Sequence, residues 1–260
     1  MTELNVAIEN IYMYVLVFIR LTAIIAFNPI FSRNNIPSIV RTGIIFFSTI
    51  ILTPAIPIPS GYEGNSFELI GGAIREIAVG WLLGYVFNIF FYMLIMVSDI
   101  LDMQFGLSMA KVMDPGTNVQ SAFTGNLVNL LFMAYFFVTN THLVLIKLAV
   151  CSYDLIPAGA AGINFDAAIG FGIDIFTAAF SIAMRLALPF VAVELILEIG
   201  MGILMKLIPQ IHIFVINMQF KILLAIVALF IMAKPITVFM ENYIIIIIEG
   251  MNDALKALAS

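Results

Sequence analysis

The sequence is poor in charged residues, histidine and cysteine, and each shortage argues against a class of protein. Charged side chains make up 10% of the 260 residues, whereas an ordinary soluble domain carries about 25%. The 11 Lys and Arg residues form no basic block and the net charge is −5, which argues against a nucleic-acid partner because phosphate binding requires a clustered cationic face. The single cysteine, Cys151, cannot form an intramolecular disulfide.

Signatures of catalysis are also scarce. Only 2 histidines occur, and no HExxH, Walker A or paired-cysteine motif is found. Tyr153-Asp154 with Gly170–Asp174 is faintly similar to the YD and GxGD motifs of intramembrane aspartyl proteases, but the glycines are one residue out of register and both acids are expected in one Gly-rich connection. A hydrolase built from Ser108 and His142 has no better support. We therefore predict no enzyme, no catalytic residue, no metal site and no cofactor.

Hydrophobic residues dominate instead and indicate a membrane protein. They make up 63% of the chain, and the mean hydropathy is +1.12, which is too apolar for one buried core of a soluble domain. Uncharged stretches such as 42–62, 77–98 and 115–146 each reach the about 20 residues that a membrane-spanning helix needs. The first nine residues contain no Lys or Arg, so we expect no cleaved signal peptide and an attached first segment.

The hydrophobic pattern predicts an all-α fold, because lipid-exposed backbone must satisfy its own hydrogen bonds and no alternating barrel pattern appears. Pro189 lies inside the fifth apolar segment and Pro235 inside the sixth, so these two are expected to kink or break into bent helical hairpins. The absence of a linker or repeat favours a single helical membrane domain over residues 1–260. About six apolar segments are expected, at 8–31, 39–58, 70–101, 125–150, 175–205 and 211–248.

Several charges lie inside these apolar segments, where a lipid-facing charge costs at least about 2.5–3.5 kcal/mol. Glu194 and Glu198 are four residues apart and so share one helix face, where they require a nearby cation. The pairing is left open among Arg20, Arg185 and Lys206. Either the carboxylates form an ion or proton site of a transporter, or they belong to an ion-pair network that fixes helix register. The charges predicted to pair between helices or subunits are Arg20, Arg185, Glu194, Glu198 and Lys221.

Small residues recur at the spacing that lets helices approach closely. Gly80 and Gly84 form a GxxxG motif, and Ala179, Ala183 and Ala187 form a longer stripe. Such residues pack helix backbones against each other in membrane proteins. Packing within the chain is favoured over a contact between subunits.

The connection from Phe105 to Phe123 has an unusual composition. Asp114-Pro115-Gly116 is a turn signal, yet the connection keeps Met109, Met113 and Phe123 where a solvated loop would be polar. Flexible thioether side chains can fill an irregular gap or reseal it. Composition alone leaves open whether the connection has such a role or is a re-entrant turn packed on its own helices.

Three stretches together resemble the FliR family of flagellar type III secretion export-gate proteins, which is related to the SctT proteins of injectisomes. The first stretch runs from Arg20 through Pro29 to Phe31 and continues with Ile36-Pro37 and Val40-Arg41. The second is the Gly106–Pro115 connection with its Asp-Pro. The third contains Pro209, Gln210 and Phe214 and is followed by Lys221. Two departures from the family pattern are His212, where Asn is usual, and Asn217, where Gly is common.

The resemblance implies a core subunit of the export gate in the bacterial inner membrane, at the flagellar basal body. The expected partners are FliP-like and FliQ-like subunits, FlhB-like and FlhA-like export proteins, membrane lipid and unfolded export substrates. The 106–123 connection would correspond to a plug loop that closes the export channel. Its predicted residues, together with the residue before it, are Phe105, Gly106, Met109, Met113, Asp114, Pro115 and Phe123.

Two other functions compete with the export gate. An ion-coupled secondary transporter of a small solute would line its site with Glu194, Glu198 and Arg185, but the inverted repeats typical of such proteins are not evident. A structural membrane scaffold would need no gated pore. The export gate differs from the transporter because it requires heterologous partners.

Overall fold

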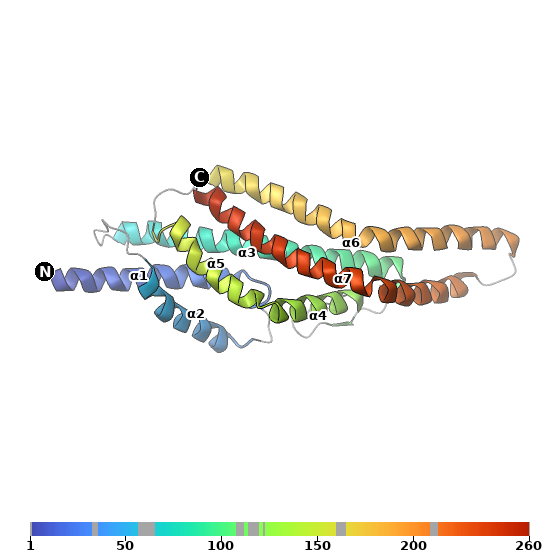
Figure 1. Ribbon diagram of the computed structural model, residues 1–260, viewed down its shortest axis with the longest axis horizontal. Coiled ribbons are helices and arrows are strands. Elements are labelled where there is room, and N and C mark those ends of the chain that lie inside the picture. The colour runs from blue at the N-terminus through green and yellow to red at the C-terminus, as the bar shows by residue number, and fades with distance from the viewer. Residues whose placement is uncertain are drawn as a thin grey trace. The chain divides into compact units, whose positions relative to one another are not determined.

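The computed structural model describes residues 2–32, 36–56, 66–107, 112–113, 120–121, 123–159, 165–208 and 213–259. The chain is almost entirely helical, which confirms the all-α prediction (Figure 1). Its elements in chain order are α1 (Thr2–Ala26), α2 (Ser38–Leu52), the short 3-10 helix η1 (Thr53–Ala55), α3 (Ser66–Gln104), β1 (Val112–Met113), β2 (Gln120–Ser121), α4 (Phe123–Val138), α5 (Thr141–Leu155), α6 (Phe165–Leu207) and α7 (Ile213–Ala259).

Four helices of the described chain are long and apolar enough to cross a membrane. They lie at 38–55, 69–104, 166–207 and 216–259, and α4 with α5 forms a bent pair that counts as a fifth if it is one span. The apolar part of α1, Ile11–Ala26, is shorter than these. The predicted apolar segments, about six in number, thus correspond to helices. Four helices are long enough to span a membrane, one segment is a bent pair, and the first apolar helix is short.

The position of the helix break differs from the prediction. α6 continues through Pro189 and α7 through Pro235, so a break at these prolines is wrong, whereas a kink there stays a prediction. A proline disrupts bonding only locally, and long flanking helices can persist around it. The break lies in the fourth segment instead, where α4 and α5 meet at 66°. Asn140 there adopts a left-handed backbone conformation with φ 56°, which asparagine tolerates better than most residues.

The contacts divide the chain into two compact units. The first contains Met1–Ile89, Asn140–Phe176 and Ile246–Ser260, and the second contains Phe90–Thr139 and Thr177–Ile245. Helices α3, α6 and α7 each contribute residues to both units. The prediction of one domain over residues 1–260 stays a prediction.

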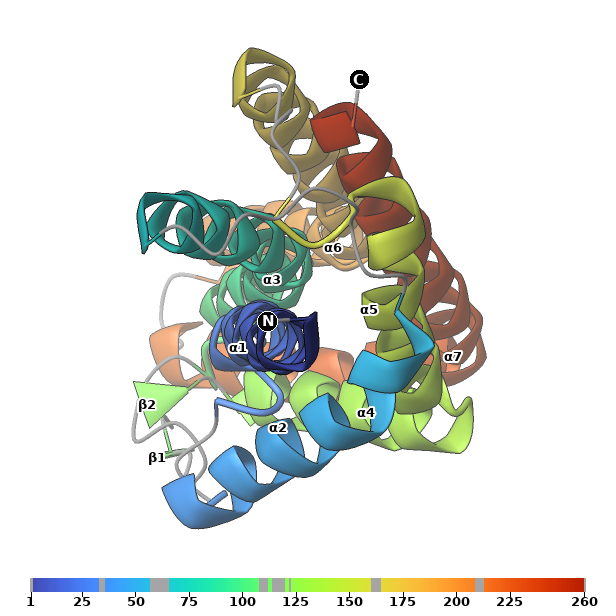
Figure 2. The same ribbon diagram turned by 90° about the vertical axis from the view of Figure 1, so that its left-hand side faces the viewer.

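In the first unit, α1 packs closely against α3 and also contacts α2 (Figure 2). A Cβ atom at Gly80 would lie 2.5 Å from the Cβ of Ala23, and one at Gly84 would lie 2.4 Å from the Cβ of Phe27. These distances are too short for any side chain, so glycine is required at both positions. The GxxxG motif therefore packs two helices of the same chain, as predicted.

Aromatic side chains form much of the core of the second unit. Tyr243 of α7 donates a hydrogen bond of 2.8 Å to the carbonyl of Phe90, and their rings meet edge to face. Phe91 of α3 packs in the same way against Phe132 of α4. The small-residue stripe of α6 at residues 179, 183 and 187 is fully buried, which agrees with its predicted role in packing.

Candidate functional site

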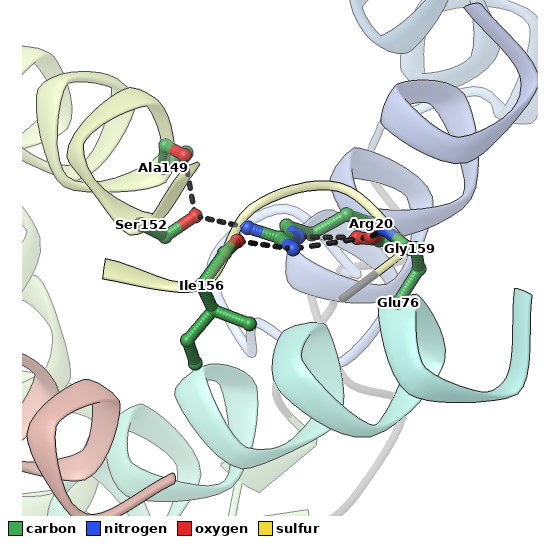
Figure 3. Close-up of polar contacts among 6 residues, drawn as sticks. All are labelled: Arg20, Glu76, Ala149, Ser152, Ile156 and Gly159. Atoms are coloured by element: carbon green, nitrogen blue, oxygen red, sulfur yellow. Dashed lines mark hydrogen bonds and ion pairs between the residues drawn. The ribbon is translucent and has the colours of Figure 1, made fainter. Parts of the chain in front are cut away.

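Arg20 lies in the C-terminal part of α1 and is completely buried. Its guanidinium is paired with the carboxylate of Glu76 on α3: Nε donates to Oε2 and Nη2 donates to Oε1 at 3.1 Å. Nη1 donates to the Ser152 hydroxyl of α5 at 3.0 Å, and Nη2 also reaches the carbonyl of Ile156 at 2.9 Å. Figure 3 shows the guanidinium between Glu76 and these two residues. We call Arg20, Glu76, Ser152, Tyr153 and Ile156 the Arg20 cluster.

The remaining bonds of the Arg20 cluster attach the segment after α5. Oε1 of Glu76 accepts a hydrogen bond of 2.9 Å from the backbone N–H of Gly159, whose φ of 71° favours glycine. The ring of Tyr153 lies 3.9 Å from the guanidinium carbon of Arg20, which is a cation–π contact. All three nitrogens of the guanidinium are therefore engaged, and these hydrogen bonds use four of its five N–H donors, so this cluster is a clamp between α1, α3 and the end of α5.

The second charge cluster, which contains buried Glu194, is centred on Lys221 of α7. Its Nζ lies 2.7 Å from Oε1 of Glu194 and donates a hydrogen bond of 2.8 Å to Oε1 of Glu198, both on α6. The same Nζ donates to the backbone carbonyl of Gln104 at 3.3 Å. Glu194 is 0% exposed, Lys221 14% and Glu198 54%. We call Lys221, Glu194, Glu198 and Gln104 the Lys221 cluster.

The Lys221 cluster identifies the cation that Glu194 and Glu198 require. The sequence placed both carboxylates on one helix face and left the cation open among Arg20, Arg185 and Lys206. Arg20 is instead paired with Glu76, and Arg185 is exposed on α6. The observed contacts fit the ion-pair interpretation, whereas the transporter alternative expected Arg185 to line a site with the two carboxylates.

The connection between α3 and α4 is fixed at both ends. Asp102, in the last turn of α3, accepts hydrogen bonds from the backbone N–H of Thr124 at 3.1 Å and from its hydroxyl. This bond satisfies an N–H at the start of α4 that has no partner within the helix. Phe105 is buried against Phe190 of α6, with ring centroids 6.1 Å apart. The two ends of the connection are therefore held next to each other.

The structure describes only part of the predicted plug loop. Gly106 has φ 71° and turns the chain out of α3, and Phe123 is the half-exposed first residue of α4. Met113 lies in β1, which pairs antiparallel with β2 in the register Met113 to Gln120. Met109, Asp114 and Pro115 lie outside the described residues. Whether the connection closes a pore stays a prediction.

The residues of the family motif mark helix boundaries where they are described. Pro29 is buried just after α1, where the Asn28 side chain accepts a hydrogen bond from the N–H of Ile30 at 2.9 Å. Pro37 is the residue before α2. Phe214 lies in the first turn of α7. Pro209 and Gln210 lie outside the described residues.

The residues considered for catalysis lie on two different helices where they are described. Tyr153 and Asp154 lie in α5, whereas 170–174 lies inside α6, so the expected Gly-rich connection holding both acids is wrong. A Cβ atom at Gly172 would lie 3.6 Å from the Tyr85 ring, so this part of α6 is packed, and tertiary contacts override the low helix propensity of glycine. Ser108 lies outside the described residues. Within the described ranges, no group of three or more His, Cys, Asp or Glu residues could hold a metal.

Sequence reasoning missed Glu76 and Asp102. Glu76 lies next to Arg75 near the start of an apolar segment, a position typical of a solvated helix end. Its burial follows only from the close approach of α1 and α3 at Gly80. The one signal for Glu76 was the unmatched charge of Arg20, whose partner had to come from another helix.

Comparison with known proteins finds similar sequences along most of the chain. Residues 11–245 match the model of a family described as bacterial export proteins, family 1. The flagellar biosynthetic protein FliR of Bacillus subtilis (strain 168) is 28% identical over 254 residues, which cover 97% of this chain and 98% of the relative. FliR of Escherichia coli (strain K12) is 29% identical over 212 residues, 80% of this chain and 78% of the relative. The Yop proteins translocation protein T of Yersinia pestis is 28% identical over 213 residues, 80% of each chain.

Proposed function

The chain belongs to family 1 of the bacterial export proteins, and from this premise we propose that it is a core subunit of the flagellar type III protein export gate. The family and the names of the relatives support a membrane component of a type III export apparatus. We infer the partners, the location and the plug loop from the resemblance to FliR.

The observation that carries the proposal is the apolar surface of the long helices. α6 and α7 leave large hydrophobic side chains exposed along much of their length, including Ile173, Phe180, Ile196, Ile203 and Phe230. Exposed apolar surface on this scale requires lipid or another protein to cover it. We propose that FliP-like and FliQ-like subunits cover part of it in the inner membrane at the flagellar basal body, and that FlhB-like and FlhA-like proteins contact the assembly.

The proposed mechanism needs no chemistry in this chain. The subunit contributes to the wall of a conduit for unfolded export substrates, and the connection between α3 and α4 closes that conduit at rest. Apolar side chains in a narrow pore exclude ions by occlusion or dewetting until a substrate displaces them. The fixed ends of the connection, at Asp102–Thr124 and Phe105–Phe190, support this proposal because a plug must return to the same place.

Secretion assays test the function directly. An in-frame deletion of the gene is expected to abolish the appearance of flagellar export substrates in the culture medium while their synthesis continues. A copy supplied in trans restores secretion. Normal secretion in the deletion strain, accompanied by a defect in uptake of a small solute, would instead support the transporter alternative.

A further inference from the structure

We propose that Lys221 is a positioning residue for the plug loop, and that it holds the end of α3 from which the α3–α4 connection emerges. The inference rests on the proposed function, because only a channel-closing connection makes this position matter for permeability. The contacts that carry it lie entirely among described residues of the second unit.

Lys221 joins three helices at one point. Its Nζ contacts Glu194 and Glu198 of α6 at 2.7 and 2.8 Å, and it donates to the carbonyl of Gln104 at 3.3 Å. Gln104 is the last residue of α3, so its carbonyl is one of those that a helix end leaves without an intrahelical partner. A cation is favourable there because the C-terminal end of a helix carries partial negative charge.

The two glutamates orient the lysine for this bond. Glu194 is completely buried, and its attraction to Lys221 keeps the long side chain inside the protein although it lies beside partly exposed Glu198. Phe190 lies one turn before Glu194 on the same face of α6 and packs against Phe105. The face of α6 formed by Phe190, Glu194 and Glu198 thus receives the end of α3 through one apolar contact and one polar contact.

The bond between Asp102 and Thr124 extends this hold to the other end of the connection. Because Asp102 lies two residues before Gln104 in the last turn of α3, the same turn carries both the contact to α4 and the contact to Lys221. Loss of the Lys221 contact therefore leaves this turn, with the starts of both the connection and α4, held to α6 by the apolar contact of Phe105 with Phe190. We infer that α6 and α7 set the position of the plug loop through Lys221.

The test removes both charges of the buried pair and measures the connection directly. The Glu194→Gln, Lys221→Met double variant leaves no buried unpaired charge, which a Lys221 substitution alone would do. Each variant also carries Cys151→Ala and Leu107→Cys. A membrane-impermeant maleimide then reports the accessibility of position 107, where half-buried Leu107 lies three residues after Gln104. Labelling rate and ion leak are measured in native membranes, with co-purification of the partner subunits as the check on assembly.

We expect the double variant to assemble, to label about tenfold faster at position 107, as loss of one charge-assisted hydrogen bond allows, and to make the membrane leaky. The single substitution Lys221→Arg should keep slow labelling and a tight membrane, since it keeps the cation beside Glu194. Lys256→Met serves as the matched control because Lys256 is an exposed lysine of the same helix, paired only with Asp253 of its own turn. It should change neither readout.

An assembled double variant with unchanged labelling would overturn the proposal. If the double variant fails to assemble, Glu194→Gln combined with Lys221→Gln keeps polar side chains at both positions and still removes the cation from the carbonyl of Gln104, and unchanged labelling in that variant would overturn the proposal as well. Deletion of residues 113–117 separates this inference from the proposed function. A tight membrane after the deletion rejects the plug, whereas faster labelling in the double variant still supports Lys221 as the residue that positions the end of α3.

Discussion

Arg20 on α1 and Glu76 on α3 are 56 residues apart in sequence and form a fully buried ion pair. The pair lies where Gly80 lets the two helices approach, since the Gly80 position is also close to the backbone carbonyl of Arg20. Close helix packing and charge pairing therefore occur at the same place. The sequence indicated that Arg20 needs a partner, and only the structure identified that partner as Glu76.

Replacing Arg20 should destabilise the protein strongly. Arg20→Ala leaves the Glu76 carboxylate buried without its cation, which costs about 3–5 kcal/mol. Arg20→Lys should recover only part of this loss, because an ammonium group cannot reproduce the bidentate fork and the bonds to Ser152 and Ile156 together. Thermal unfolding of the detergent-extracted protein measures the effect.

The Arg20→Met, Glu76→Leu double variant refines this test. It removes both charges, yet the carbonyl of Ile156 and the N–H of Gly159 lose partners, so the double variant should remain less stable than the original chain. Lys256→Ala, at the exposed pair with Asp253, should cost at most about 1 kcal/mol. Equal stability of Arg20→Ala and Lys256→Ala would contradict the role of the Arg20 cluster.

The glycines of α3 should differ sharply in their tolerance of a methyl group. Gly80→Ala places a Cβ 2.5 Å from Ala23 and should separate α1 from α3, lowering both the melting temperature and the yield of assembled protein. Gly71→Ala is the matched control in the same helix, because nothing lies within 4 Å of its Cβ position. That substitution should be neutral or stabilise by up to about 1 kcal/mol through helix propensity. Similar effects at both positions would refute the packing assigned to Gly80.

The contact between Asp102 and Thr124 should protect the start of α4. Asp102→Ala removes the acceptor of the Thr124 N–H and hydroxyl, and loss of such a capping bond costs about 0.5–2 kcal/mol. Hydrogen exchange in the first turn of α4 should then become faster. Met103→Ala changes the neighbouring exposed residue and should leave exchange unchanged. If Asp102→Ala leaves exchange unchanged too, the two ends of the connection are not held together in this way.

Shortening the α3–α4 connection should open the channel without preventing assembly. Deletion of Met113–Thr117 removes the strand residue Met113 and the Asp-Pro sequence that follows it, while the contacts of Asp102 and Phe105 remain outside the deletion. We expect an intact complex whose membrane leaks small ions and solutes, because the apolar closure of the pore is lost. Conductance across native-membrane vesicles measures the leak, and a tight membrane around an intact complex would reject the plug.

Hydropathy predicted the helices well, but it could not locate the helix break. Apolar segments follow from the chemistry of the bilayer alone, and each predicted segment corresponds to helix. Pro189 and Pro235 looked like the natural breakpoints, yet both lie inside continuous helices. The break at Asn140 depends on one left-handed backbone conformation, which neither composition nor periodicity reveals.

For the charge clusters, the sequence predicted which residues need a partner but not which partner each one has. The four-residue spacing of Glu194 and Glu198 shows that they share a face and need a cation. The choice of Lys221 over Arg185 depends on how α7 packs against α6, which is a tertiary property. Glu76 could not be identified because its burial comes from a glycine contact one turn away in α3, although the unmatched Arg20 indicated that such a partner must exist.

Membership of an export gate is tested most directly by the proteins that remain bound to this one. The chromosomal copy is tagged, the protein is extracted gently from native membranes, and mass spectrometry measures the intact mass and identifies every bound chain. The account predicts a large complex containing FliP-like and FliQ-like subunits. A protein recovered alone or as a homodimer would contradict it.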